Sequence, residues 1–288
     1  MPQATVVAKQ SSAQSTIIYG ASLTGKTTLA LSLASKFKVL YIDGENGRSL
    51  LANLPPAWLR NIYVQPVYDN KDNYNFVNSA MFLANGTKAQ MCDAHGILMN
   101  KPAITPACAE CRELNKEVPA IKAGEFTNGI INEWTLNSLD PNEWVVVWDS
   151  FTQLASSANA LATRKLDMGK DEFEEFKHWR SQGRYLEKFL DYMQGAQYNT
   201  VVISHEQMGK MEDASSKIVP SGGTYDFSRK IPRYFNNALY SHIRNKKHMV
   251  VSTTTGDAKV LAGTRGNHTI DVTTLDTMAR DMCKLYGK

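Results

Sequence analysis

The sequence predicts an α/β fold with a mainly parallel central sheet and a small insertion, and three observations favour this class. Short segments rich in Val, Ile and Tyr alternate with segments of helical periodicity, which is the element order of parallel sheets. A glycine-rich turn joins the first apolar segment to the first helical one. Residues 85–140 break the alternation and contain three of the four cysteines.

The composition is that of an ordinary globular protein. The 288 residues are 43% hydrophobic and 21% charged, which suits one domain with an insertion or two small domains. No apolar run approaches the roughly 20 residues of a membrane helix, and residues 1–15 lack the apolar core of a signal peptide. We therefore expect a cytoplasmic protein without membrane contact. The net charge of +4 permits an acidic partner such as nucleic acid but does not require one.

The first part of the core spans residues 15–84 and follows a polar, flexible tail at residues 1–14. Residues 15–19 form a short apolar strand that leads into the glycine-rich turn. Residues 26–36 have helical spacing of apolar residues, with Leu29, Leu33 and Phe37 on one side. The other elements expected before the insertion are strands at residues 38–43 and 62–67 and a short helix at residues 75–84.

The second part of the core spans residues 141–288. Its first strand, Trp144–Asp149, is the most apolar segment of the chain, and a long polar loop follows later at residues 206–237. Residues 238–261 have the pattern of several strands with a turn at residues 255–257. The remaining elements expected here are a long helix at residues 171–195, a strand at residues 200–204 and a final helix at residues 273–285.

The glycine-rich turn matches the phosphate-binding pattern G-x-x-x-x-G-K-[ST] at every fixed position. Its glycines allow backbone N–H groups to point at phosphate oxygens, and the helix that follows adds favourable partial charge. Lys26 is expected to reach the β- and γ-phosphates of ATP, and the Thr27 hydroxyl to bind Mg²⁺. The residues that we expect to bind the nucleotide are Gly20, Ala21, Ser22, Leu23, Thr24, Gly25, Lys26, Thr27 and Thr28.

Hydrolysis needs a second contact to magnesium and a group that activates water. Asp149 ends a buried strand and suits the metal contact, although an Asp in this place can also cap a turn. Glu45 is the candidate base, with Asp43 as a rival and a solvated loop acid as the alternative interpretation. His205 or Gln207, after the next buried strand, can sense the γ-phosphate or simply end that strand.

A cysteine–histidine cluster in the insertion predicts a zinc site. Cys92 and His95, and then Cys108 and Cys111, form two pairs with two-residue gaps, and 12 residues separate the pairs. Three thiolates and one imidazole complete a tetrahedral Zn²⁺ site without an open position, so its role would be structural. The alternative is four unrelated residues. Cys283 stands apart and is expected to be a buried or terminal thiol.

The order of these motifs resembles the RecA-like recombinase core over roughly residues 15–265, outside the insertion. The phosphate loop comes first, followed by segments that end Ile-Asp-Gly-Glu45, Val-Val-Trp-Asp-Ser150 and Val-Ile-Ser-His205, and then by a Gly-Gly loop. The short N-terminus makes it similar to bacteriophage RecA-like ATPases of the single-strand annealing and recombination group. The resemblance implies ATP hydrolysis, binding of single-stranded DNA, assembly into filaments or rings, and residence in the host cytoplasm.

The resemblance also implies roles for single residues. Glu45 corresponds to the catalytic glutamate and Asp149 to the Walker B aspartate, whereas His205 departs from the glutamine that couples ATP to DNA. Residues 206–237 would form the DNA-binding loop. Its candidates for phosphate contact are Lys210, Lys217, Arg229, Lys230 and Arg233, and Tyr225 and Phe227 are those for base stacking. The candidates for completing a neighbour's ATP site are Arg265 and Lys259, with Arg244, Lys246 and Lys247 as alternatives.

Two other functions fit part of this pattern. A nucleotide-gated loader or assembly factor would use the same ATP site on a protein partner, which could be a single-strand-binding or recombination protein. A small-molecule kinase would share the phosphate loop, but we find no arginine-rich segment that resembles a kinase lid.

Overall fold

The structure is a computed structural model of the chain, and it describes residues 13–69, 75–86, 89–92, 96–98, 130–165, 175–209, 217–253 and 259–288. Nearly all of the predicted tail therefore lies outside the described residues. Among the described helices, none combines the length and the apolar character of a bilayer span.

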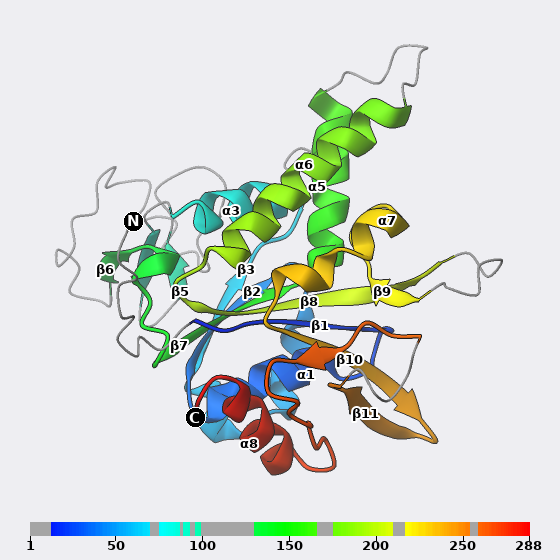
Figure 1. The fold of residues 1–288 in the computed structure, drawn as a ribbon. Coiled ribbons are helices and arrows are strands. Elements are labelled where there is room, and N and C mark those ends of the chain that lie inside the picture. The colour runs from blue at the N-terminus through cyan, green and yellow to red at the C-terminus, as the bar shows by residue number, and fades with distance from the viewer. Residues whose placement is uncertain are drawn as a thin grey trace, which may run out of the picture.

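A large, mainly parallel sheet forms the centre of the molecule (Figure 1). Its strand order is β11-β10-β1-β8-β7-β2-β3, and every neighbouring pair is parallel except the edge pair β10 and β11. This confirms the predicted α/β class. The strands are β1 (Ser15–Gly20), β2 (Lys38–Asp43), β3 (Ile62–Pro66), β7 (Trp144–Asp149), β8 (Asn199–Met208), β9 (Ile218–Pro220), β10 (Asn237–Arg244), β11 (Lys247–Val251) and β12 (Gly263–Thr264).

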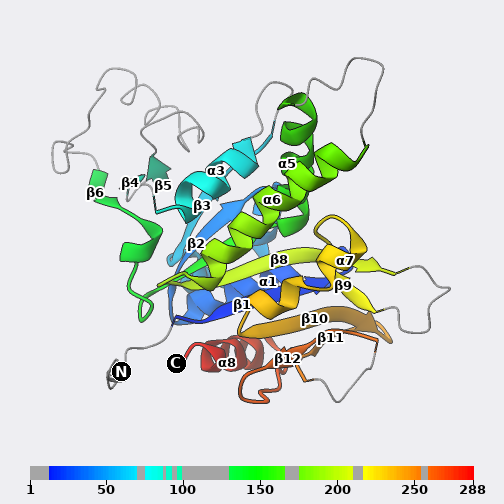
Figure 2. The same cartoon turned by 45° about the horizontal axis from the view of Figure 1, so that its top comes forward.

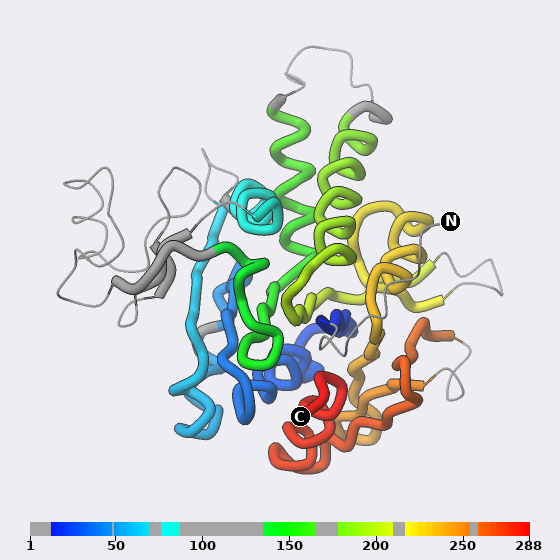
Figure 3. The backbone as a smooth tube through the Cα atoms, turned by 60° about the vertical axis from the view of Figure 1, so that its left-hand side comes forward, coloured from blue at the N-terminus to red at the C-terminus, as the bar shows by residue number. Residues whose placement is uncertain are grey.

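Helices cover both faces of this sheet (Figures 1 and 2). One face carries α1 (Lys26–Leu31), η1 (Ser32–Ser35), η2 (Gly47–Asn53), α2 (Pro56–Leu59) and α8 (Leu275–Leu285). The other face carries α3 (Asn75–Ala84), α5 (Phe151–Lys165), α6 (Glu175–Gln194), α7 (Tyr225–Ser228) and η4 (Ile231–Tyr234). In Figure 3, α5 and α6 form an antiparallel pair that extends beyond the sheet.

The alternation of side chains along the strands divides the core between these two faces. In β7, Val145 and Val147 pack toward α1, whereas Val146 and Trp148 pack toward α6. The Trp148 ring meets the edge of the Phe189 ring with centroids 5.2 Å apart. Because β7 is buried on both faces, its sequence is a continuous apolar run, as parallel strands require.

One long helix was not predicted from the sequence, and one strand is longer than predicted. Helix α5 was not predicted, because its buried face consists mainly of small residues such as Ala155, Ala158 and Ala162, which give little apolar contrast. Strand β8 continues to Met208 instead of ending at residue 204, and β9 pairs with this polar extension. This part of the predicted loop is a strand because its backbone hydrogen bonds to β9 do not depend on apolar side chains.

The C-terminal strands also differ from the expectation. Strands β10 and β11 form a hairpin whose turn is at Asn245 and Lys246, and both have positive φ, at 52° and 60°. The turn expected at residues 255–257 lies outside the described residues. The final helix is confirmed, and the side chain of Thr274 caps its first turn by accepting a hydrogen bond from the N–H of Thr277.

The insertion contains a three-stranded antiparallel sheet of β4 (Ala89–Cys92), β5 (Gly96–Leu98) and β6 (Ile130–Trp134). A 3-10 turn, η3 (Leu136–Ser138), leads back to the core, where Leu136 and Leu139 are buried. Cys92 ends β4, but His95, Cys108 and Cys111 lie outside the described residues. In the part of the chain that the structure describes, no group of three or more His, Cys, Asp or Glu side chains is arranged to hold a metal ion.

Candidate active site

The phosphate loop lies between β1 and α1, and its backbone is fixed by neighbouring strands. A methyl group on the α-carbon of Gly20 would overlap the carbonyl oxygen of Ser241, so only glycine fits there. Gly25 has a positive φ of 87°. The carbonyl oxygen of Thr24 accepts a hydrogen bond from Ser241 Oγ at 2.7 Å and lies 3.1 Å from Nδ1 of His248. These contacts attach the loop to β10 and β11.

Lys26 is buried at the base of this loop. Its Nζ donates to the carbonyl oxygens of Gly20 and Ala21, at 3.1 and 2.6 Å. Burial lowers the pKa of Lys26, and the nearby negative charges of Asp149 and Glu45 oppose this effect. The structure therefore places a lysine ammonium where the phosphate chain of a nucleotide would lie along the loop.

Asp149 and Thr27 meet beside Lys26. Thr27 Oγ1 donates to Asp149 Oδ2 at 2.8 Å, and the Tyr41 hydroxyl donates to the same oxygen at 2.9 Å. Burial raises the pKa of Asp149 to about 6, although these two hydrogen bonds act in the opposite direction. A carboxylate and a hydroxyl that converge at this distance form a donor set that suits Mg²⁺.

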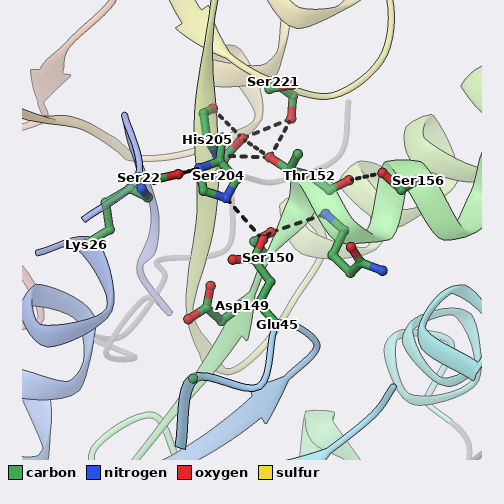
Figure 4. A network of polar contacts seen from close by, with 12 residues as sticks. Ser22, Lys26, Glu45, Asp149, Ser150, Thr152, Ser156, Ser204, His205 and Ser221 are labelled. Carbon is green, nitrogen blue, oxygen red and sulfur yellow. Dashed lines mark hydrogen bonds and ion pairs between the residues drawn. The ribbon is translucent and has the colours of Figure 1, made fainter. Parts of the chain in front are cut away.

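Glu45 lies just beyond the end of β2 and faces the same space (Figure 4). Ser150, which is joined to Asp149 by a cis peptide bond, donates a hydrogen bond to Glu45 Oε1, and Nε2 of His205 lies 3.3 Å from the same oxygen. Burial alone would raise the pKa of Glu45, but the hydrogen bonds from His205 and Ser150 and the charge of Lys26 outweigh it. The pKa is therefore lowered, and Glu45 is ionised at neutral pH.

Asp43, the rival for the role of base, has a structural task instead. It is fully buried, and its Oδ1 accepts hydrogen bonds from the backbone N–H groups of Glu45 and Gly47, at 3.2 and 3.0 Å. Its Oδ2 accepts a hydrogen bond from the Tyr68 hydroxyl at 2.8 Å. Asp43 therefore shapes the turn that presents Glu45.

These residues surround one cavity of about 940 Å³, which is a usual size for a small-molecule site. The phosphate loop, Glu45, Asp149 and His205 contribute to its polar lining. Apolar side chains from β11, from α8 and from the segment before α8 also line it, including Val250, Val272, Leu275 and Met278, and the volume leaves room for a nucleoside.

Most residues predicted to act on the nucleotide thus lie together, because β1, β2 and β7 end at the same level of the sheet and His205 of β8 lies beside that level. Gly20 of β1 is paired with His205 of β8, and Asp149 of β7 with Asp43 of β2. Arg265 is the exception. It is exposed and follows β12, which pairs with the opposite end of β10, and it does not line the cavity.

Several residues of the site were not predicted from the sequence. Tyr41 has the pattern of an ordinary core residue in a strand, and Ser150 that of a turn residue. Ser241 and His248 belong to strands more than 200 positions after the loop that they contact, since the contacts span 217 and 224 residues. No local sequence pattern indicates such a contact.

A chain of polar contacts connects the cavity to the segment after β8 (Figure 4). Ser22 Oγ of the phosphate loop lies 3.4 Å from Nδ1 of His205. The backbone N–H of Ser221 donates to the carbonyl oxygen of His205 at 2.7 Å. Ser204 Oγ in turn donates to the carbonyl oxygen of Ser221 at 2.9 Å. Gln207, the alternative sensor, accepts a hydrogen bond from Ser228 Oγ and does not line the cavity.

A second, smaller cavity of about 450 Å³ lies beyond this segment and is basic. Lys217, Arg229 and Arg233 line it, together with Phe235 and the chain from Val260 to Gly263. No acidic residue is among the described residues that line it. Of the other predicted phosphate contacts, Lys230 is exposed outside this cavity and Lys210 lies outside the described residues.

The two aromatic residues predicted to stack on bases have protein partners. The Tyr225 hydroxyl donates to the carbonyl oxygen of Lys217 at 2.9 Å, and the guanidinium of Arg229 lies over its ring at 5.9 Å. Phe227 packs against the hydrophobic core beneath α5 and α6. Base stacking by these two residues stays a prediction.

The match to one protein family agrees with this geometry. A family profile described as an AAA domain matches residues 12–265, which is most of the chain. No curated protein sequence shows a significant match. One similar solved structure is an ATPase from the type III secretion system of pathogenic bacteria, with 12% identity and a TM-score of 0.39. The match covers 80% of this chain and about half, 51%, of that ATPase. The chain belongs to the AAA domain family of P-loop ATPases.

Proposed function

We propose that the protein hydrolyses ATP at this site and couples hydrolysis to the binding of single-stranded DNA, as a recombination or single-strand annealing protein of a bacteriophage. The observation that supports this most is the chain of contacts from Ser22 through His205 to Ser221, because it joins the phosphate loop to the segment that borders the basic cavity. A change at the nucleotide would thus reach the residues that are available to phosphates of DNA.

Five residues of the cavity have a task in hydrolysis. Thr27 and Asp149 would hold Mg²⁺, which neutralises charge on the transferred phosphoryl group. Lys26 binds the phosphates next to the metal. Glu45, ionised and directed into the cavity, accepts a proton from the attacking water. His205 contacts both Glu45 and Ser22, so its position reports whether a γ-phosphate lies between them.

The basic cavity supports the DNA part of the proposal. Three cationic side chains line it and no described acidic residue does, which is an arrangement that attracts a phosphodiester backbone. Each phosphate contact contributes about 0.7 to the slope of log affinity against log salt for a single strand. Replacing Arg229 and Arg233 by Gln should therefore reduce this slope by about 1.4.

The position of Arg265 supports assembly into a filament or ring. Arg265 does not line the cavity of its own subunit, so its proposed role in stabilising transition-state charge requires a neighbouring subunit. Lys259, Arg244, Lys246 and Lys247 are the alternatives for this role. To identify the residue, each candidate is replaced by glutamine and the variant is mixed with an Asp149→Asn protein. If the replaced residue acts between subunits, the Asp149→Asn protein supplies it to the otherwise intact site of the variant, and turnover is restored in the mixture.

The zinc site remains a proposal from the spacing of Cys92, His95, Cys108 and Cys111. Elemental analysis of the purified protein should give one zinc per chain. The control is a protein with Cys283→Ser, which should keep the metal, and far less than one zinc per chain in the unaltered protein would refute the site.

The decisive experiment is ATP turnover with and without single-stranded DNA, together with gel-shift binding at low salt. We expect DNA to raise turnover, and we expect the Arg229→Gln, Arg233→Gln variant to lose this effect while keeping its basal rate. Arg184→Gln, on the exposed side of α6, is the matched control. If DNA neither binds nor stimulates, a loader that acts on a protein partner becomes the better proposal. Transfer of the γ-phosphate to a small acceptor would instead indicate a kinase.

A further inference from the structure

We propose that Tyr41 is a positioning residue of the magnesium site, whose phenol hydroxyl holds the Asp149 carboxylate in the orientation that receives the metal. The inference rests on the proposed ATPase function and adds to it a residue that the phosphate-loop motifs do not include.

The register of the sheet brings the two side chains together. Tyr41 of β2 lies directly opposite Val147 of β7, so Asp149 is its diagonal neighbour two residues further along. Residues two apart in a strand point to the same face, and diagonal neighbours are within reach of a long aromatic side chain. Tyr41 packs with Val147 on the face that carries α1, and its hydroxyl reaches the carboxylate at the end of β7.

The hydroxyl of Tyr41 is enclosed and has a defined partner. The residue is fully buried, and its Oη donates to Asp149 Oδ2 at 2.9 Å. A methyl group on Gly47 would lie 2.6 Å from the same Oη, so the turn after Glu45 closes over the phenol. An ionised carboxylate only accepts hydrogen bonds, so the Tyr41 phenol is the donor in this contact.

Tyr41 is a donor to Asp149 that would not itself bind the metal. Among the described residues, the two side-chain hydrogen bonds that reach the Asp149 carboxylate come from Tyr41 and Thr27, and both end on Oδ2. The Thr27 hydroxyl is the group that would bind Mg²⁺ in a phosphate loop, so the metal itself would fix its position. Tyr41 is not a ligand, so its hydrogen bond continues to orient the carboxylate. Outer partners of this kind typically change metal affinity by about tenfold or more.

The test is the magnesium dependence of nucleotide binding in Tyr41→Phe, which keeps the buried ring and removes only the hydroxyl. Binding of a fluorescent, non-hydrolysable ATP analogue is titrated with Mg²⁺. We expect the Mg²⁺ concentration at half-maximal binding to rise about tenfold. Affinity measured in EDTA should stay within about twofold of the unaltered protein, because the phosphate loop and Lys26 are unchanged. Circular dichroism verifies that the variant is folded.

A double-mutant cycle separates this role from a general effect on stability. In an Asp149→Ala background, where the acceptor of the Tyr41 hydrogen bond is absent, Tyr41→Phe should cause no further rise in the Mg²⁺ requirement. Tyr286→Phe is the matched control, because this buried hydroxyl donates to Thr16 Oγ1 at 2.8 Å, away from the cavity. It should lower stability without changing the Mg²⁺ requirement.

The outcomes are distinguishable. An unchanged Mg²⁺ requirement in folded Tyr41→Phe, or a further rise in the Asp149→Ala background, would overturn the role of Tyr41. Failure of the unaltered protein to bind the nucleotide with Mg²⁺ would overturn the proposed function itself.

Discussion

The metal-binding carboxylate should destabilise the protein when no metal is present, and replacing Asp149 by Asn measures this cost. Burial raises the pKa of Asp149 from 3.8 to about 6. Between these values the folded chain binds a proton that the unfolded chain has released, so stability falls as the pH rises through this interval and stays lower above it. About 2 pKa units at 1.36 kcal/mol each give a cost of about 3 kcal/mol at pH 7.5.

The asparagine introduced by Asp149→Asn would accept the hydrogen bonds of Thr27 and Tyr41 through its amide oxygen and carry no charge. The substitution also removes an attraction for Lys26, so the expected net gain is about 1 to 3 kcal/mol. The same substitution should abolish hydrolysis that depends on Mg²⁺.

Urea unfolding in EDTA, at pH 7.5 and at a pH near 4, tests this reasoning. Asp149→Asn should be the more stable protein at pH 7.5, and the difference should shrink toward zero near pH 4 because both folded chains are then uncharged at this position. Adding Mg²⁺ with nucleotide should reverse the order at pH 7.5, since the ligand stabilises only the chain that binds it. An Asn variant that is less stable at pH 7.5, or a difference that does not depend on pH, would refute the burial argument.

Three further predictions concern other parts of the molecule. Glu45→Gln should retain nucleotide binding and slow turnover by about 10² to 10⁴, and normal single-turnover rates would assign the base elsewhere. Gly20→Ala should lose more than about 2 kcal/mol of stability, because its methyl group overlaps the Ser241 carbonyl; an unchanged urea midpoint would show that the strands can separate. Asp281→Asn should destabilise α8 at neutral pH, since hydrogen bonds from Arg280 lower the pKa of Asp281. That contribution should disappear from the unaltered protein as the pH falls below about 4, which pH-dependent unfolding can verify.

The strands and the phosphate loop were predictable because their signals are local. Strand β7 is a continuous apolar run that ends in Asp149, and its predicted bounds match the structure. The phosphate loop follows a fixed pattern, and the rule that parallel strands end at the same edge placed Glu45, Asp149 and His205 near it. Local sequence patterns and this single topological rule therefore predict most residues of the candidate nucleotide site.

The parts that were missed depend on contacts between distant segments. From the sequence alone, Asp43 and Glu45 are both possible catalytic bases. The two backbone hydrogen bonds that Asp43 accepts from the following turn, which only the structure reveals, indicate a structural role for Asp43. The apolar lining of the cavity combines Val250 with Met278, and no rule of sequence spacing predicts that the elements carrying them lie close together. Helix α5 was not predicted, because alanine and serine give little amphipathic contrast, although packing against the rest of the protein stabilises the helix.

Strand β8 gives the protein a mechanical property. It is continuous from Asn199 to Met208, so the residue that contacts Glu45 and the end of the strand belong to one stiff element. From His205 to Met208 the strand extends about 10 Å at its usual rise per residue. A tilt of roughly 10° at His205 would therefore move Met208 by close to 2 Å. Because the strand is continuous, a small rotation beside the nucleotide site would shift its far end by a distance that changes its hydrogen bonds with β9.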